Sequence, residues 1–152
     1  MADVQREEID ELVREMDRAR DAWVHGRLER EGTDCMVQAP DMTLFGAFGG
    51  VARNGPDLET RQARAAARFR GGAGSTEVVN AVSAGDLLVL VLIERSEVLF
   101  DGHDKPQPWV LRTTQIFRRD GDRWLRLHRH ADPLCTLQPF EAVVALANQA
   151  AS

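Results

Sequence analysis

WVLRTTQIFRRDGDRWLRLHRHADP, residues 109–133, predicts a β-hairpin whose second strand carries candidate functional groups. Two segments rich in β-branched and aromatic residues flank Asp120–Gly121, a dipeptide suited to a tight turn that needs positive φ. The second segment ends in His128, His130 and Asp132, an alternation of imidazole, imidazole and carboxylate. The hairpin is therefore where we expect any chemistry.

The second strand of this hairpin has an unusual pattern of polar residues. Side chains of a regular strand point alternately to its two faces, so one face carries every second residue. Starting from the tryptophan, that face holds Trp124, Arg126, His128, His130 and Asp132, and across a two-residue turn it meets Thr113 and Gln115. A strand that only filled a core would be apolar there. We predict that this face is the wall of a polar pocket or a polar interface.

Length and charge limit the possible partners. A chain of 152 residues fits one domain, 1–152, with a sizeable core. Its formal net charge of −5 comes from 19 basic and 24 acidic residues that are interspersed, so no basic stripe suggests nucleic acid. Arginine outnumbers lysine eighteen to one, with Lys105 the one lysine, which favours a GC-rich bacterial genome.

Neither a signal peptide nor a stretch that could span a membrane is recognisable, so we expect a cytoplasmic protein with no membrane partner. Cys35 and Cys135 lack the spacing of metal ligands or redox pairs, which predicts free, partly buried thiols. The glycines of residues 71–74 follow a predicted helix and precede a predicted strand. This order is the reverse of a phosphate-binding loop, so we predict no nucleotide site.

Periodicity predicts an α+β order of elements. The apolar run at 87–93 predicts a central strand buried on both faces. Leu58, Ala65 and Phe69 mark the inner face of a helix capped by Asp57. The full predicted order is a helix at 3–25, a short helix or turn at 26–39, a strand at 42–48, a helix after 57, strands at 76–83 and 87–100, the hairpin, and a helix at 140–149.

Two segments of this chain resemble a known family. Residues 39–46, APDMTLFG, and residues 117–132, FRRDGDRWLRLHRHAD, are similar to the SnoaL-like branch of the nuclear-transport-factor-2-like superfamily, and the order of elements agrees over nearly the whole chain. The resemblance implies a cone-shaped, curved antiparallel sheet wrapped around N-terminal helices. It also implies a homodimer formed through the outer sheet face and a cone interior that takes a small apolar or carbonyl-bearing molecule.

The resemblance does not extend to the ketosteroid isomerase machinery. The sequence contains no tyrosine, and Gly46 stands where the resemblance would place the general-base aspartate. The remaining candidates for acid/base catalysis are His128 and His130, since imidazoles titrate near neutral pH, with Asp132 to orient them. Hydrogen bonding at a sheet edge or interface would equally explain the histidines, and capping of a backbone group before Pro133 would explain Asp132.

Other side chains are predicted to contact a ligand, each with a structural alternative. Arg112 either faces the pocket or pairs with Glu94, Glu97 or Asp132. Asp41 is either a turn residue or a pocket base. The complete set of predicted ligand-binding residues is Trp23, Asp41, Phe45, Trp109, Arg112, Gln115 and Arg126.

No metal and no cofactor are predicted. Two histidines separated by one residue on a strand can chelate, and a carboxylate would complete a metal site. Residues four apart on a regular strand, however, lie about 13 Å from each other, which is too far for His128 and Asp132 to share an ion.

Two functions follow from these observations. In the first, the protein is a cofactor-independent cyclase, isomerase or dehydratase that acts on a small carbonyl compound by acid/base chemistry. In the second, it is a non-catalytic ligand-binding or assembly dimer. The sequence leaves open whether the protein is an enzyme, because one fold of this kind hosts both.

Overall fold

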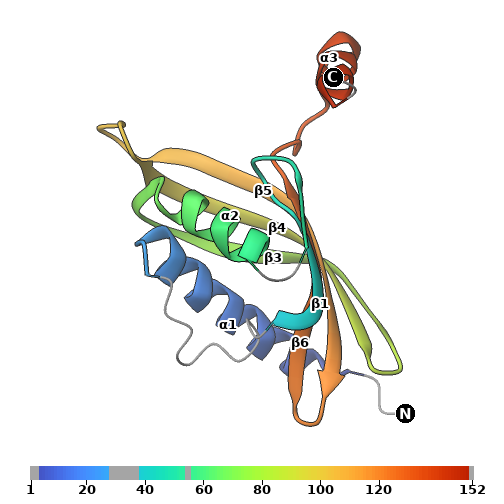
Figure 1. The fold of residues 1–152 in the computed structure, drawn as a ribbon. Coiled ribbons are helices and arrows are strands. Elements are labelled where there is room, and N and C mark those ends of the chain that lie inside the picture. The colour runs from blue at the N-terminus through green and yellow to red at the C-terminus, as the bar shows by residue number, and fades with distance from the viewer. Residues whose placement is uncertain (1–3, 28–37, 54–55, 151–152) are drawn as a thin grey trace.

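The computed structural model describes residues 4–27, 38–53 and 56–150, and the predicted α+β cone is confirmed (Figure 1). One sheet contains all six strands that lie in the described residues, in the order β2-β1-β6-β5-β4-β3. Strand β1 runs parallel to β6, and every other neighbouring pair is antiparallel. The elements are α1 (Arg6–Val24), β1 (Gln38–Phe45), β2 (Val51–Arg53), α2 (Pro56–Ala66), β3 (Phe69–Ala84), β4 (Leu87–Phe100), β5 (Gln107–Asp120), β6 (Arg123–Asp132) and α3 (Phe140–Gln149).

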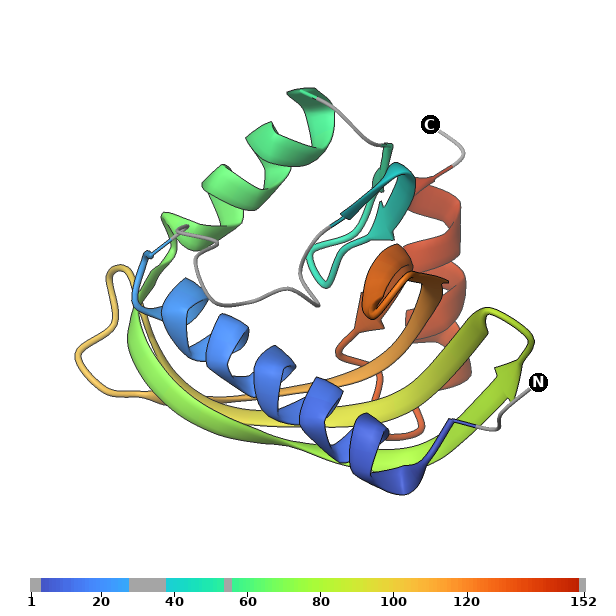
Figure 2. The same ribbon diagram turned by 90° about the horizontal axis from the view of Figure 1, so that it is seen from below.

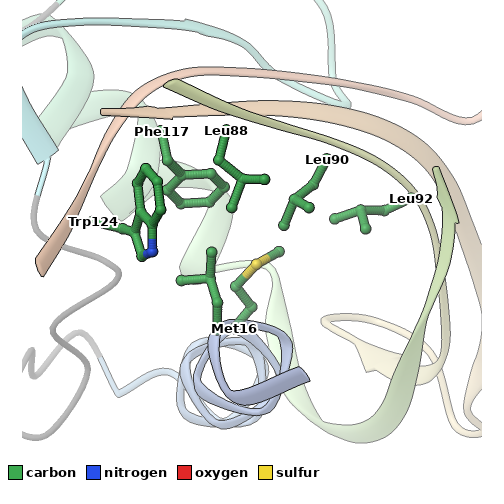
Figure 3. Packing of buried hydrophobic residues seen from close by; sticks show 7 residues of the cluster. Met16, Leu88, Leu90, Leu92, Phe117 and Trp124 are labelled. Atoms are coloured by element: carbon green, nitrogen blue, oxygen red, sulfur yellow. The ribbon is translucent and has the colours of Figure 1, made fainter. Parts of the chain in front are cut away.

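The long strands β3, β4 and β5 curve around α1, which lies on the concave face of the sheet (Figure 2). Leu12 and Met16 of α1 pack there against side chains from β4 and the hairpin (Figure 3). The sheet contributes Leu88, Leu90, Leu92, Phe117 and Trp124 to this cluster. Because the leucines of β4 recur at every second residue, they all point to the same face.

The predicted hairpin is confirmed, with its turn one residue later than expected. Asp120 pairs with Arg123, and Gly121 has a φ of 60°, the left-handed value that glycine adopts without strain. Glu8 of α1 fixes the hairpin to the helix. It accepts a hydrogen bond of 3.0 Å from the indole Nε1 of Trp124 and one of 2.6 Å from Arg119.

Two predictions about the strands are wrong. Strand β3 begins at Phe69 and includes residues 71–74, which were expected to connect elements. At Gly72, a Cβ atom would lie 2.6 Å from the carbonyl oxygen of Glu97, so glycine permits the close approach of β3 to β4. Strand β4 also lies next to the edge strand, and its outward residues Val89, Val91 and Ile93 are half-buried, whereas burial on both faces was predicted.

The C-terminal helix α3 is confirmed at the predicted residues but stands away from the sheet (Figure 1). None of its residues is buried, and Phe140, Val143 and Leu146 are exposed. The thiol of Cys135, expected to be partly buried, is exposed and free. Residues 28–37 of the predicted short helix or turn, Cys35 among them, lie outside the described residues. No helix in the described residues is long and apolar enough to cross a membrane.

Candidate functional site

A β-bulge in β6 determines which hairpin side chains point into the cone. Ile116 of β5 pairs with His128, but the next residue, Phe117, pairs with Arg126, so Leu127 is an extra residue in the second strand. The expectation that Arg126 and His128 share a face is therefore wrong. An extra residue inverts the alternation beyond it.

Beyond the bulge, Arg129 takes the inward position and the histidines point outward. Arg129 pairs with Gln115 across the strands, and both residues line the inner cavity. His130 pairs with Thr114, on the opposite face from Gln115. The concave face of the hairpin thus presents Arg126 and Arg129, while His128, His130 and Asp132 lie on the outer face.

The concave face carries a buried polar group centred on Glu94. An oxygen of its carboxylate lies 2.7 Å from Nη2 of Arg129. Its other oxygen accepts hydrogen bonds from Nε2 of Gln115 at 3.2 Å and, more weakly, from Oγ1 of Thr113 at 3.4 Å. Glu94 is 7% exposed and Gln115 is 1% exposed, so the charge of Glu94 is compensated inside the protein and not by solvent.

A cavity of about 850 Å³ opens next to this polar group. Met16 and Trp23 of α1 and Leu111 of β5 contribute apolar walls. The lining also includes Glu94, Gln115, Arg126 and Arg129 from the sheet and Ala65 from α2. The result is a mainly apolar chamber with a buried polar group on its sheet side and further polar side chains from the helices, which is a usual design of a small-molecule site.

The structure divides the residues predicted from the sequence into two sets. Trp23, Trp109, Gln115 and Arg126 line the cavity. The others do not line it and belong to the outer surface or to the sheet rim, namely Asp41, Phe45, Arg112, His128, His130 and Asp132. Ligand or catalytic roles for this second set stay predictions.

The outer set forms its own contacts. Arg112 Nε donates to Oδ1 of Asp132 at 2.7 Å, which confirms the predicted carboxylate pairing and selects Asp132 among its three candidates. The same oxygen accepts the backbone N–H of Leu134 at 2.8 Å, the capping role predicted for an aspartate before proline. His130 Nε2 lies 3.5 Å from the other oxygen of Asp132.

His128 is half-buried beside Phe45, and its ring centroid lies 5.0 Å from that of Phe45 in an edge-on arrangement. Its Nδ1 lies 2.7 Å from Oγ1 of Thr43. Burial and the neighbouring charge of His130 lower the pKa of His128 below 6.5, and a hydrogen bond of the ring to the backbone of Thr43 opposes this shift. Burial alone would raise the pKa of Asp132, but Arg112 and the backbone N–H of Leu134 outweigh it and hold the pKa below 3.8.

These two shifts predict a loss of stability on acidification. The unfolded chain binds a proton at His128 more readily than the folded protein does, so the free energy of unfolding should fall as the pH drops below 6.5. A further loss should begin below 3.8, where the unfolded state takes up the proton of Asp132 first. Urea unfolding across this range, for the native protein and for His128→Gln, measures the effect. An unchanged pH dependence in His128→Gln would contradict the assignment.

The sequence-based prediction did not select Glu94 and Arg129 as site residues. Glu94 is the fourth member of the inward series Leu88, Leu90 and Leu92, and a charged residue in phase with core leucines was the available signal. No sequence signal marked Arg129, because regular alternation places it on the outer face and only the bulge turns its side chain inward. Among the described residues, no three His, Cys, Asp or Glu side chains come together in a way that could hold a metal ion.

Comparisons with known proteins identify the fold. No family model and no curated protein match the sequence. A nuclear-transport-factor-2-like superfamily protein from Salmonella enterica serovar Typhimurium has a TM-score of 0.70 at 13% identity, over 89% of this chain and 94% of that protein. A candidate dehydratase from the same family, from Streptomyces avermitilis, has a TM-score of 0.68 at 14% identity, over 86% of this chain and 97% of that one. The CaMKII hub of S. rosetta has a TM-score of 0.62 at 16% identity, over 86% of this chain and 98% of that protein. The chain therefore has the nuclear-transport-factor-2-like fold.

Proposed function

We propose that the cavity binds a small, mostly apolar molecule that carries a carbonyl or hydroxyl group, and that this polar group lies against Glu94, Gln115 and Arg129. The volume of about 850 Å³ falls within the range of small-molecule pockets. As part of this proposal, we assign the chain to the SnoaL-like branch of the superfamily.

The side-chain oxygen of Gln115 carries the proposal. It is buried and has no hydrogen-bond partner among the described residues, while the amide nitrogen of the same side chain donates to Glu94. A buried acceptor without a donor costs about 1–3 kcal/mol, and natural proteins rarely leave one. A ligand hydroxyl, or the enol form of a ligand carbonyl, would supply the donor, and the apolar walls would hold the rest of the molecule.

Acid/base chemistry is the finer part of the proposal. Glu94 is the lining carboxylate that lies beside Gln115, so it would exchange a proton with a ligand held there, as a cofactor-independent isomerisation or dehydration would need. Arg129 would orient that carboxylate. His128 and His130 remain the candidates predicted from the sequence, and they would need a ligand on the outer face.

Filling the cavity should abolish ligand binding. The probe is N-phenylnaphthylamine, an uncharged apolar dye whose fluorescence rises in a dry site. We expect saturable binding to the native protein and at least a tenfold loss in Ala65→Trp, because Ala65 lines the cavity. Ala63→Trp is the matched control, since Ala63 lies on the same helix and is exposed. Equal binding by the two variants would contradict the proposal.

Assembly into a homodimer is a second candidate function, and apolar residues on the outer face of the sheet favour it. The outward residues Val89, Val91 and Ile93 of β4 are half-buried, and Val82 on the same face of β3 is 52% exposed. A contiguous group of apolar side chains on the outer face of a sheet commonly marks a protein–protein interface. Neighbours in fold include association domains, so we propose a homodimer through the outer sheet face.

Native mass spectrometry tests this second candidate and reports any retained small molecule in the same spectrum. We expect a mass of twice 16.9 kDa for the native protein. Val82→Asp, which adds a charge to the proposed interface, should shift the population to monomer. A native protein that remains monomeric at tens of micromolar would exclude the dimer.

A further inference from the structure

Arginines of α2 and of the turn that follows it lie along the cavity. Arg61 and Arg64 are three residues apart on α2, and Arg68 lies in the turn after its last residue. All three line the cavity together with Ala65. Arg64 and Arg68 are also exposed, so they stand at the opening of the cavity and not on its floor.

The charges around the cavity are predominantly positive, although the chain as a whole carries −5. Among the described residues that line it, six are arginines and two are carboxylates. The arginines are Arg20, Arg61, Arg64, Arg68, Arg126 and Arg129, and the carboxylates are Glu94 and Asp101. An enclosed positive region on an acidic protein concentrates anions.

Several of these charges are already compensated. Arg129 pairs with Glu94 at 2.7 Å, and Arg61 pairs with Asp57 at 3.1 Å. Asp101 pairs with Arg70 at 2.8 Å. Arg20 pairs with Asp17 and also donates to Thr76.

Arg64 and Arg68 differ from these residues, because neither makes an ion pair within the described part of the chain. Both carry their positive charge at the same opening of the cavity. Arg64 lies in the last turn of α2, where the negative end of the helix dipole stabilises its positive charge. Arg68 lies beyond the helix, so this stabilisation does not explain its charge there. Two guanidinium groups that make no ion pair with another described residue, at the mouth of an apolar chamber, suit an oxyanion. Each guanidinium can bind an oxyanion through two hydrogen bonds.

We propose that the ligand is an acidic amphiphile, with its apolar body inside the cavity and its carboxylate, or a similar oxyanion, bound between Arg64 and Arg68. This inference rests on the proposed function, because it names the chemical class of the molecule in the same cavity.

A pair of matched dyes tests the inference. Anilinonaphthalene sulfonate has the ring system of N-phenylnaphthylamine plus one sulfonate, so the difference between their affinities reports the anion site. The native protein should bind the sulfonate dye about tenfold more tightly, the gain expected from one charge-assisted contact. Arg64→Gln/Arg68→Gln should remove this preference and weaken binding of the sulfonate dye far more than binding of the uncharged dye. Added salt should weaken binding of the sulfonate dye only, because salt screens the attraction between charges.

Arg95→Gln is the control for loss of charge, because Arg95 lies on the outer face and pairs with Glu77 at 3.3 Å. Sulfonate binding that is equal in the native protein and in Arg64→Gln/Arg68→Gln would overturn the inference, as would an equal loss in Arg95→Gln. Binding of both dyes that is insensitive to Ala65→Trp would instead refute the cavity as a ligand site. The two failures are thus distinguishable.

Discussion

Phe117→Ala is expected to lower the free energy of unfolding by about 3–5 kcal/mol. Phe117 is 0% exposed and packs between Trp124 and the inward leucines of β4 (Figure 3). Its loss would leave a cavity between the sheet and α1, because the curved strands cannot close fully around a missing ring. Chemical denaturation followed by circular dichroism measures the difference.

The neighbouring residue provides the control for Phe117. Arg118 points to the outer face, where its side chain is 42% exposed and lies 3.5 Å from Asp41. Arg118→Ala should therefore cost less than about 1 kcal/mol. Similar losses for the two variants would show that the hairpin does not present Phe117 inward, and the assignment of the cavity face would fail with it.

Glu94→Gln is expected to destabilise the protein by about 3 kcal/mol, because it leaves Arg129 as a largely buried charge without its partner. The side chains of Glu94 and Arg129 are 9% and 19% exposed, so water can replace the lost carboxylate only in part. Gln115 and Thr113 would lose the charged acceptor of their hydrogen bonds as well. Denaturation curves of Glu94→Gln, Arg129→Gln and the double variant would give the coupling energy of the pair.

Glu77→Gln is the matched control, since Glu77 pairs with Arg95 at 3.3 Å on the outer face with side chains 60% and 55% exposed. That change should cost less than about 1 kcal/mol. If Glu94→Gln were as mild as Glu77→Gln, the polar group on the concave face would be solvated, and the proposed ligand contact with Gln115 would lose its basis.

Several elements followed from local sequence because their signals are local. The Asp120–Gly121 pair placed the hairpin within one residue, since glycine adopts the positive φ that a tight turn requires. The helix predicted at 3–25 is present as α1, and Leu12 and Met16, four residues apart on one side of it, are both buried. The apolar run of β4 predicted a strand but not its single inward face, because both faces of the run are apolar in the sequence.

The candidate site was predicted only in part. Trp23, Trp109, Gln115 and Arg126 line the cavity, whereas His128 and His130 do not. The error has one cause, the extra residue Leu127, because a one-residue shift inverts every side chain beyond it. No residue type marks a bulge of this kind in β6, so regular alternation was the natural expectation.

The sequence by itself determined the α+β order, the hairpin and the apolar series that form the core, since turn preference and hydrophobic period act between near neighbours in the chain. Only the tertiary structure decided that Arg129 meets Glu94, and that Arg64 and Arg68 stand over the same cavity as Gln115. Those positions depend on the curvature of the sheet, on the bulge and on where α2 packs. Each of these arises from contacts between residues far apart in sequence, which local patterns do not encode.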